Sequence, residues 1–551
     1  MTELTPIPVE DKDILDFWPI PEFTPRPIQV RALEWMASLP EDVKYIFLQA
    51  PVGSGKSLIG ATYSNYMHRS WAQNAFLLTP QRILQEQYEQ SFDRDFVATL
   101  YGKSNYTCRN KNSTCDIGSL VKPACKNCPY ENAKAAAKRN PNVVLNYTIA
   151  FLAFKYTPIF DLPEREDISA KGRPLMVLDE CHTIENHLTE LDAVMITEGR
   201  CKQIGIPFKM IPMLSAAVKW IKETYIPACE KYSETLYGEL RDIIDGHEEP
   251  TAEHTTKLRR LKGIDDHIDL IYESILRHKI ESLNNQVVLL ADKNSMKFKR
   301  LTGGAAFRNI VEPMADKFLF MSSTILNYEG FCQDLGIDPS QAAYLDLGSD
   351  FPVENRPIMF KPQMKMNYKW KDKENAQHRE KMLKYVRKIL DDHQDENGII
   401  HSGSFAISRW LVENLEHDIP HKIFHHNPES GDDRNAVIKA FQKSKVPSVL
   451  ISPSITEGLD LKDDLGRFAI FAKVPFPNMA DAWVKRRMEM SNEWYQRQTL
   501  INIIQGGGRV VRSKEDWGVT YILDGSFDFL YKRAHQMIPQ WWKDSYKVIR
   551  T

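Results

Sequence analysis

The sequence has no run of about 20 apolar residues, the length that a helix needs to cross a bilayer. It therefore predicts no membrane partner. The opening run, MTELTPIPVEDKD, is acidic and lacks the basic and apolar regions of a secretion signal. We accordingly expect a cytoplasmic protein, which includes association with a nucleoid or residence in the cytoplasm of a virus-infected host.

Net charge and cysteine are also scarce. The formal charge is −2, so any affinity for nucleic acid has to come from local basic surface and not from overall charge. Eight cysteines in 551 residues are too few for a disulfide scaffold, but four of them lie in one short segment between residues 108 and 128. In a cytoplasmic protein such a group indicates metal or cluster binding. The length predicts about three or four domains.

Short apolar runs rich in β-branched or aromatic residues alternate with longer amphipathic stretches, the pattern of parallel sheets covered by helices. The runs fall into two groups, so we expect an α/β protein with two sheets and a cleft between them. The strands expected in the first unit are residues 45–49, 75–79, 143–145, 175–178 and 318–321. Those expected in the second unit are residues 398–401, 448–452, 468–472 and 519–523.

A charged, glycine-poor stretch at residues 196–300 separates the last two expected strands of the first unit. Its apolar residues recur at steps of three and four, which gives one apolar stripe along a helix. We therefore predict a separate helical domain, although the stripe alone indicates only that helices pack there. The stripe consists of Leu258, Leu261, Ile264, Ile268, Ile271 and Ile275.

A glycine-rich run, APVGSGKS at residues 50–57, directly follows the first expected strand and precedes an apolar helical start. This is the context of a phosphate-binding P-loop. The backbone N–H groups of such a loop turn toward the phosphates, the lysine supplies a positive charge and the serine hydroxyl can hold Mg²⁺. The residues predicted to bind the phosphates of ATP are Gly53, Ser54, Gly55, Lys56 and Ser57.

Two carboxylates follow the fourth expected strand. Asp179 and Glu180 stand at its carboxyl end, where ligands of open α/β sheets bind. We assign Asp179 to Mg²⁺, through water, and Glu180 to positioning and polarising the attacking water.

Phosphoryl transfer also needs positive charge on the departing phosphate, and this charge often comes from another domain. The run QGGGRVVR at residues 505–512 fits this need. Arg509 and Arg512 are three residues apart, so on a helix they would point the same way. Gln505, Arg509 and Arg512 are therefore candidate catalytic residues.

The order of these motifs is specific, and the chain resembles superfamily 2 helicases, closely the XPD/DinG branch. Residues 179–182 read DECH, which resembles the family's DEAH box with cysteine in place of alanine. The approach to Cys108 and the KVPFP run at residues 473–477 are similar to passages of this branch. The other matching segments are residues 26–29, 79–82, 322–324, 401–405, 457–460 and 505–512.

This resemblance implies two RecA-like P-loop motor domains with an inserted Fe–S domain and an inserted helical (arch) domain. It implies an ATP-dependent DNA helicase, a monomeric motor that travels 5′ to 3′ on single-stranded DNA and unwinds forked DNA. It places Arg26 and Gln29 on the adenine side of ATP and Asp460 among the nucleotide-binding residues. The implied domains are residues 1–100, 141–195 and 301–345 (motor domain 1), 101–140 (Fe–S cluster domain), 196–300 (arch) and 346–551 (motor domain 2).

The four grouped cysteines, Cys108, Cys115, Cys125 and Cys128, have six, nine and two residues between them. Four thiolates complete the ligand set of a 4Fe–4S cluster, but a tetrahedral zinc site uses the same set. The spacing leaves both possibilities open. The segment lies where the resembled family inserts its cluster domain, which favours the cluster over zinc. We expect its role to be structural.

Single strands are held by positive charge that follows the backbone and by aromatic platforms for the bases. The candidates in or beside the motifs are Lys103, Tyr106, Asn146, Tyr147, Trp483, Arg486 and Arg487, although each is individually more typical of a structural residue. A basic tail could also touch DNA, while a solvated terminal helix fits it better. The tail contains Lys532, Arg533, Trp541, Trp542, Lys543, Lys547 and Arg550.

Two other functions fit parts of the sequence. The first is a DNA-stimulated ATPase or translocase that remodels protein–DNA or R-loop structures without processive unwinding. The second, of another class, is an Fe–S redox or nuclease enzyme that uses ATP as a switch. Only about 25 residues precede the motif at residues 26–29, so no space is left for an N-terminal exonuclease domain in this sequence.

Overall fold

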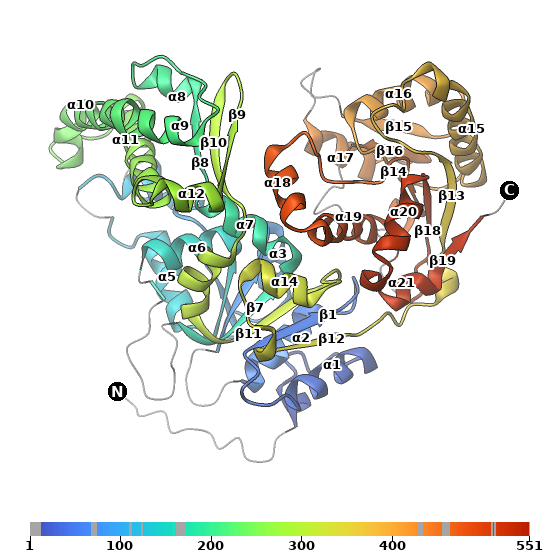
Figure 1. Ribbon diagram of the computed structural model, residues 1–551. Helices are drawn as coiled ribbons and strands as arrows, with labels where there is room; N and C mark the ends of the chain where they lie inside the picture. Colours follow the sequence, from blue (N-terminus) through green and yellow to red (C-terminus); the bar gives the residue numbers. More distant parts are fainter. Residues whose placement is uncertain are drawn as a thin grey trace.

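The computed structural model contains two α/β units, each built on a seven-stranded sheet. In Figure 1 the first unit runs from blue to yellow, the second from orange to red, and a green helical part extends from the first. The structure describes residues 13–67, 74–109, 113–122, 125–157, 159–160, 172–426, 433–453, 463–508, 511 and 514–549. Within these ranges no helix is long and apolar enough to cross a membrane.

The first sheet is parallel throughout, with the strand order β12-β1-β11-β7-β2-β6-β3. Its central strands are apolar on both faces, as strands covered by helices on both sides must be. Phe47 and Phe76 pack on one face, and Ile46 and Leu77 pack on the other. The strands are β1 (Tyr45–Gln49), β2 (Ala75–Thr79), β3 (Val97–Thr99), β6 (Asn142–Asn146), β7 (Arg173–Asp179), β11 (Ala315–Ser322) and β12 (Ala342–Asp346).

Helices cover both faces of this sheet. One layer consists of α1 (Pro27–Ala37), α2 (Lys56–Tyr66) and α3 (Arg82–Ser91). The opposite layer consists of α5 (Pro129–Arg139), α6 (Tyr147–Tyr156), α7 (Ile184–Leu191) and α14 (Tyr328–Leu335).

The second sheet is also parallel, with the order β15-β16-β14-β17-β18-β13-β19. Its strands are β13 (Ile358–Met364), β14 (Gly398–His401), β15 (Lys422–His425), β16 (Ser448–Ser452), β17 (Phe468–Phe471), β18 (Val519–Asp524) and β19 (Tyr546–Val548). The helices α15 (Ala376–Asp392) and α16 (Phe405–Leu415) pack on one face. The other face carries α17 (Arg434–Gln442), α19 (Asn492–Gly507), α20 (Ser526–Arg533) and α21 (Gln540–Ser545).

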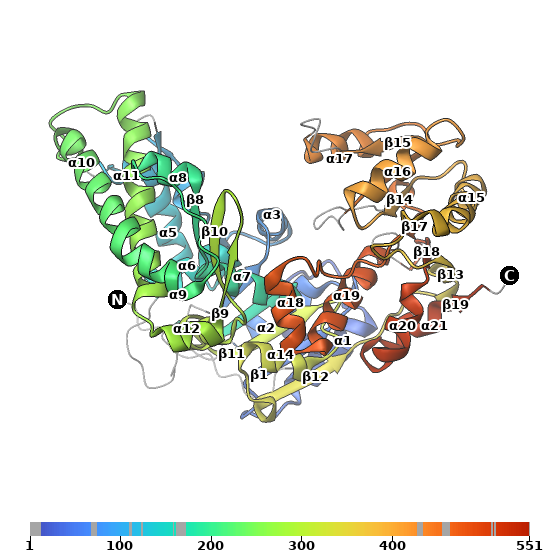
Figure 2. The same ribbon diagram turned by 45° about the horizontal axis from the view of Figure 1, so that its top comes forward.

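The insert in the first unit is helical, but it also contains a sheet that the sequence analysis did not predict. Three antiparallel strands have the order β8-β10-β9, namely β8 (Val194–Thr197), β9 (Val287–Ala291) and β10 (Ser295–Arg300). Its helices are α8 (Glu198–Gln203), α9 (Leu214–Trp220), α10 (Ile226–Ile244), α11 (Ala252–Ile271) and α12 (Ile280–Gln286). We refer to this insert as the arch; it stands above the first sheet in Figures 1 and 2.

The apolar stripe of α11 divides between two partners. Leu258 and Leu261 pack with Ile117 and Val121, which follow the short strands β4 (Thr107–Cys108) and β5 (Ser113–Thr114). Ile264 and the later members of the stripe pack within the arch itself. One helix therefore joins the arch to the segment that carries the four grouped cysteines.

A buried histidine in the arch makes its stability depend on pH. Burial, followed by the charge of Arg200, lowers the pKa of His267 to about 3, and its ring lies 3.1 Å from the Tyr225 hydroxyl. Between the ordinary pKa of about 6.5 and pH 3 the unfolded chain binds a proton that the folded chain does not. The free energy of unfolding should therefore fall with decreasing pH in this window, by up to about 1.4 kcal/mol per pH unit.

We expect His267→Gln to remove this part of the pH dependence, measured by urea unfolding of the full chain between pH 7 and 5 (roughly the upper part of the window). The control is His247→Gln, because His247 is exposed at the end of α10. Equal slopes for the His267 variant and the unmodified chain would contradict the prediction.

Candidate nucleotide site

The loop between β1 and α2 has the backbone of a phosphate-binding loop. Gly53 and Gly55 have φ of 78° and 79°, a left-handed conformation that favours glycine. A Cβ at Gly55 would also collide with the side chain of Gln29. Lys56 begins α2, where the helix N-terminus attracts anions. The Ser54 hydroxyl is buried and has no hydrogen-bond partner among the described residues.

Arg26 and Gln29, which the resemblance places beside adenine, contact this loop. The Arg26 guanidinium donates to the Gly53 carbonyl over 2.7 Å, and Gln29 Nε2 donates to the Ser54 carbonyl over 3.0 Å. Gln29 Oε1 accepts from the Arg26 backbone N–H over 2.8 Å. The two side chains therefore support the loop from the start of α1.

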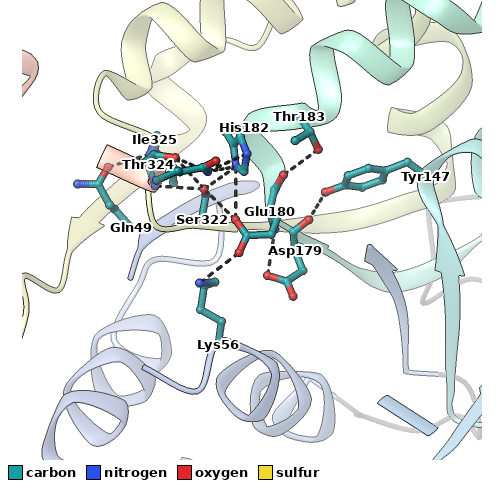
Figure 3. Close-up of polar contacts among 11 residues, drawn as sticks. Gln49, Lys56, Tyr147, Asp179, Glu180, His182, Thr183, Ser322, Thr324 and Ile325 are labelled. Carbon is teal, nitrogen blue, oxygen red and sulfur yellow. Dashed lines mark hydrogen bonds and ion pairs between the residues drawn. The ribbon is translucent and has the colours of Figure 1, made fainter. Parts of the chain in front are cut away.

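The two carboxylates lie opposite the loop lysine, as Figure 3 shows. Lys56 Nζ is 3.5 Å from Glu180 Oε1. Burial, and then the charge of Glu180, raise the pKa of Asp179 to about 7, while Lys56 acts in the opposite direction. Glu180 has a φ of 48°, a strained conformation for a residue with a side chain. Tyr147 and Thr183 bind the backbone here, since their hydroxyls donate to the carbonyls of Asp179 over 2.6 Å and Glu180 over 3.0 Å.

Ser57 and Asp179, the two predicted magnesium ligands, lie beside the same buried phenol. Burial, and then the charge of Asp179, raise the pKa of Tyr88 on α3, while the Ser57 side chain acts in the opposite direction. The structure therefore brings together the P-loop serine and the aspartate at the end of β7. A hydroxyl and a carboxylate oxygen suit Mg²⁺, which keeps several of its waters in proteins.

A residue of the second unit reaches these groups. Gln505 Nε2, on α19, lies 2.8 Å from His182 Nε2 and donates to Thr324 Oγ1 over 3.0 Å. His182 Nδ1 lies 2.9 Å from Ser322 Oγ and 3.4 Å from Glu180 Oε2. The resemblance matched residues 322–324 to the family motif that couples hydrolysis to DNA movement, but the sequence did not predict that His182, Ser322 and Thr324 contact one another or Gln505. The sequence feature that could have indicated these contacts is a polar residue at or just after the end of a buried strand.

A cavity lies between the two units beside the loop. Pro51 and Val52 line it from the first unit, and Gly507, Gly508 and Val511 line it from the second. Two of the predicted catalytic residues lie outside the described residues, namely Arg509 and Arg512. The same is true of residues 457–460, which include the predicted nucleotide-binding residue Asp460. Gly508 and Val511, which are next to these arginines in the sequence, thus line the same cavity as Pro51 and Val52 at the start of the P-loop.

Gln49, directly before the P-loop, connects three parts of the structure. Its Oε1 accepts from the backbone N–H groups of Ile325 over 2.9 Å and Leu326 over 2.7 Å, and its Nε2 donates to Asp346 Oδ2 over 2.9 Å. Leu326 has a φ of 63° and packs in the core of the second unit. Sequence analysis did not predict a role for Gln49, which reads as an ordinary strand residue.

The four grouped cysteines are all free thiols near one another in the chain. Cys115 Sγ lies 3.9 Å from Cys128 Sγ, and burial followed by Cys128 raises the pKa of the Cys115 thiol to about 11, with a further contribution from Cys108. The Cys125 thiol instead points to the Lys126 carbonyl over 3.6 Å. The donors suit a cluster or zinc, but the described part of the chain contains no group of three or more side chains arranged to hold a metal ion.

Several residues considered for DNA contacts are buried, and for them the hypothesis is wrong. Tyr147 is completely buried, and Arg487 is 2% exposed in ion pairs with Glu185 and Asp334. Trp483 is 9% exposed and donates to the Arg300 carbonyl. Asn146 caps α6, whereas Lys103 and Arg486 are exposed and Tyr106 is half-buried.

The basic tail is part of the second unit. Trp542 is buried in its core, and β19 pairs with β13. Lys532, Arg533 and Lys547 are exposed, and Arg550 lies outside the described residues.

Comparisons with known proteins match both units to helicase-related models. Residues 381–545 match the helicase C-terminal domain model, and residues 22–208 match the model of the type III restriction enzyme, res subunit. The regulator of telomere elongation helicase 1 of Rattus norvegicus is 31% identical over 109 residues, which are 17% of this chain and 8% of that protein. A Fanconi anemia group J protein homolog of Gallus gallus is 29% identical over 85 residues, 13% of this chain and 7% of that protein. The matches thus span less than a tenth of these relatives.

Solved structures share the fold across nearly the whole chain. The structure named XPD_Helicase has a TM-score of 0.61 at 14% identity and covers 95% of this chain and 99% of its own. The structure of S. tokodaii Xpd4 has a TM-score of 0.55 at 12% identity, with 95% and 100% coverage. The prediction of two RecA-like parallel-sheet domains is confirmed by this likeness.

The contacts of Gln49 lead to a prediction about stability. Gln49→Leu would leave two buried N–H groups and the Asp346 carboxylate without this partner, so we expect a loss of roughly 2–5 kcal/mol in the free energy of unfolding. Urea unfolding followed by tryptophan fluorescence measures it. Gln90→Leu, on the exposed side of α3, is the control and should change stability by less than about 0.5 kcal/mol. Similar values for the two variants would contradict the assignment.

Proposed function

Because the chain belongs to the XPD/DinG-like family of superfamily 2 helicases, we propose that it is an ATP-dependent DNA helicase. The motor moves along single-stranded DNA and unwinds duplex DNA. One observation carries the proposal: Gln505 of the second unit contacts His182, two residues from the Glu180 carboxylate that faces the P-loop lysine. Groups from both units therefore meet beside the P-loop.

The first unit supplies the binding half of the reaction. Lys56 and the N-terminus of α2 attract the phosphates, while Arg26 and Gln29 support the loop on the adenine side. Ser57 and Asp179 are the residues that would hold Mg²⁺, which supplies positive charge to the phosphate oxygens. Glu180 is the residue that would orient and polarise the attacking water, and its Oε1 already lies 3.5 Å from Lys56 Nζ.

The second unit supplies the transition-state half. Arg509 and Arg512 follow the end of α19 by a few residues, so they would stabilise charge on the departing phosphate when the cleft is closed. Asp460 belongs to the same proposed nucleotide set. Gln505 is placed to sense closure, because it contacts both His182 and Thr324.

The partners we propose are single-stranded and forked DNA, with 5′ to 3′ travel by a monomeric motor. Exposed Lys103 lies over the Tyr130 ring at 5.4 Å, at the start of the cysteine segment, and offers a contact to the DNA backbone. We propose residues 101–140 as a cluster domain, residues 196–300 as an arch, residues 346–551 as the second motor domain and the remaining residues as the first.

We further propose that Cys108, Cys115, Cys125 and Cys128 hold a 4Fe–4S cluster, with zinc as the alternative. Thiolates are the usual ligands of both. A bound group would cross-link β4, α4 (Cys115–Gly118) and the start of α5, which makes its contribution structural. The hydrophobic contact between this segment and the arch would then be fixed as well.

The phosphate assignment is tested by Lys56→Ala. Loss of this charge should lower ATP turnover by roughly 100-fold or more and abolish unwinding of a forked duplex. The control is Lys384→Ala on the exposed side of α15. A Lys56 variant that keeps both activities refutes the assignment. ATP turnover by the unmodified chain without strand release would instead favour a translocase that remodels protein–DNA structures.

The cluster assignment is tested by iron content. We expect anaerobically purified protein to be brown and to contain about four irons per chain. Cys128→Ser should lose the iron, whereas Cys201→Ala, at a buried thiol of the arch, should retain it. A content of about one zinc per chain and no iron would show that the four cysteines bind zinc instead of a cluster. This result would not affect the assignment of the chain as a motor.

A further inference from the structure

Four charged side chains are buried where the two units meet. Glu185 on α7 and Asp334 on α14 come from the first unit, and Arg487 on α18 (Ala482–Met490) and Arg497 on α19 come from the second. The arginines are only 2% and 3% exposed. We call these four residues the ion cluster of the two units; it pairs two guanidinium groups with two carboxyl groups, and burial, followed by the charge of Asp334, raises the pKa of Glu185 to about 7.

Asp334 is central to this ion cluster. Its Oδ1 accepts from Arg487 Nη2 over 2.8 Å, and its Oδ2 accepts from Arg497 Nη2. Glu185 accepts from Arg487 over 2.8 Å and from Trp494 Nε1 over 3.1 Å. The Arg487 guanidinium also lies over the Trp494 ring, 4.8 Å from its centre. Asp334 thus binds both helices, α18 and α19, at once.

The charges depend on each other across the boundary between the units. The Nε atoms of Arg487 and Arg497 have no hydrogen-bond partner among the described residues, so the carboxylates of the other unit provide much of their compensation. A buried charge that loses its partner is strongly unfavourable. Asp334 and Glu185 therefore stabilise the α18–α19 pair in this position.

The position of α19 decides where Gln505 lies. Arg497, Ile501 and Gln505 follow at steps of four and share one helical face. The eight residue steps from Arg497 to Gln505 span about 12 Å along the helix axis. At the far end Gln505 contacts His182, and α19 stops at Gly507. A rigid helix thus connects the ion cluster with the nucleotide cleft.

We propose that Asp334 is a positioning residue for ATP hydrolysis: it holds α18 and α19 against the first unit, so that Gln505 lies beside His182 and Thr324 at the nucleotide cleft. This inference rests on the proposed ATPase function. Asp334 lies outside every motif matched in the sequence. It does not touch the reacting atoms and acts through α19.

A purely adhesive role makes a different prediction. If Asp334 only held the units together, its loss would lower stability in proportion to any effect on activity. A positioning role predicts different effects on kcat and on KM for ATP. The P-loop that binds ATP belongs to the first unit, whereas the arginines proposed to stabilise the transition state belong to the second. The kcat should then fall while KM for ATP changes little.

The test is Asp334→Asn in the full chain, a change that keeps the shape of the side chain. We expect kcat for DNA-stimulated ATP hydrolysis to fall about tenfold or more and KM to stay within about twofold. Energy transfer between fluorophores on non-natural amino acids at positions 90 and 413, on α3 and α16, should report a longer mean distance. The matched control is Glu489→Gln, which removes the exposed Arg486–Glu489 pair of 3.4 Å on α18 and should change neither quantity.

A double variant guards against simple misfolding. Asp334→Asn combined with Arg497→Gln leaves fewer stranded charges, so its unfolding midpoint should recover toward that of the unmodified chain. Its kcat should stay low, because the link between Asp334 and α19 is lost. Recovery of both stability and kcat would show that the ion cluster is only adhesive and would overturn the proposal.

Two outcomes separate this inference from the proposed function. An Asp334 variant with normal kcat and normal distance, while Lys56→Ala has lost hydrolysis, overturns the positioning role and leaves the motor intact. An unmodified chain without ATPase activity overturns the proposed function. In that case a longer distance between the fluorophores in the Asp334 variant would still show that the ion cluster holds the units together. The proposed role of Asp334 in hydrolysis would nevertheless be wrong.

Discussion

The 2.8 Å contact between Gln505 and His182 is the interaction on which the nucleotide cleft depends. Each unit by itself is an open parallel sheet whose strand ends form half of a site. The carboxyl ends of β7 and β11 carry Glu180 and Ser322, and the approach of α19 places Gln505, a polar group of the second unit, beside them. A cavity lined by residues of both units follows from the same approach. The chemistry of the cleft is therefore a property of the relative placement of two sheets, and any force that holds α19 in place contributes to it.

Two residues with strained backbone lie where the first unit contacts the second. Glu180 and Leu326 have φ of 48° and 63°, and each follows one of the adjacent strands β7 and β11. Such conformations are unfavourable by about 1–3 kcal/mol and persist only where the surroundings determine them. Thr183 holds the Glu180 carbonyl, and Gln49 holds the Leu326 N–H. The strained backbone directs the Glu180 side chain toward Lys56 and the Leu326 side chain into the core of the second unit. One strained residue therefore faces the P-loop, and the other contacts the second unit.

The sequence predicted the central strands and the local phosphate loop, because both leave a signal within a few residues. β1, β2, β14 and β16 are continuous apolar runs that are entirely buried, and the turn from Gly53 to Lys56 needs glycine at fixed places. It missed β3, β12, β13, β15 and β19, which lie at or next to an edge of their sheets and have partly exposed side chains. It also considered Arg487 for DNA, whereas its partner Glu185 lies 302 residues away. No local pattern reveals a partner at that separation, since the fold alone brings the two charges together.

The cysteine segment is attached to the rest of the molecule at two ends, and the second attachment leads back to the cleft. At one end Ile117 and Val121 pack against the arch. At the other, α5 begins directly after Cys128, and the buried Arg173 side chain donates to the Ala137 carbonyl over 2.8 Å and the Asn140 carbonyl over 3.0 Å near its C-terminus. Arg173 is only 1% exposed, so its guanidinium has exchanged water for those carbonyls. Arg173 is the first residue of β7, and Asp179 is the last. Because a strand paired on both sides is stiff along its length, the contacts of α5 and the position of Asp179 and Glu180 are tied to one element of the sheet.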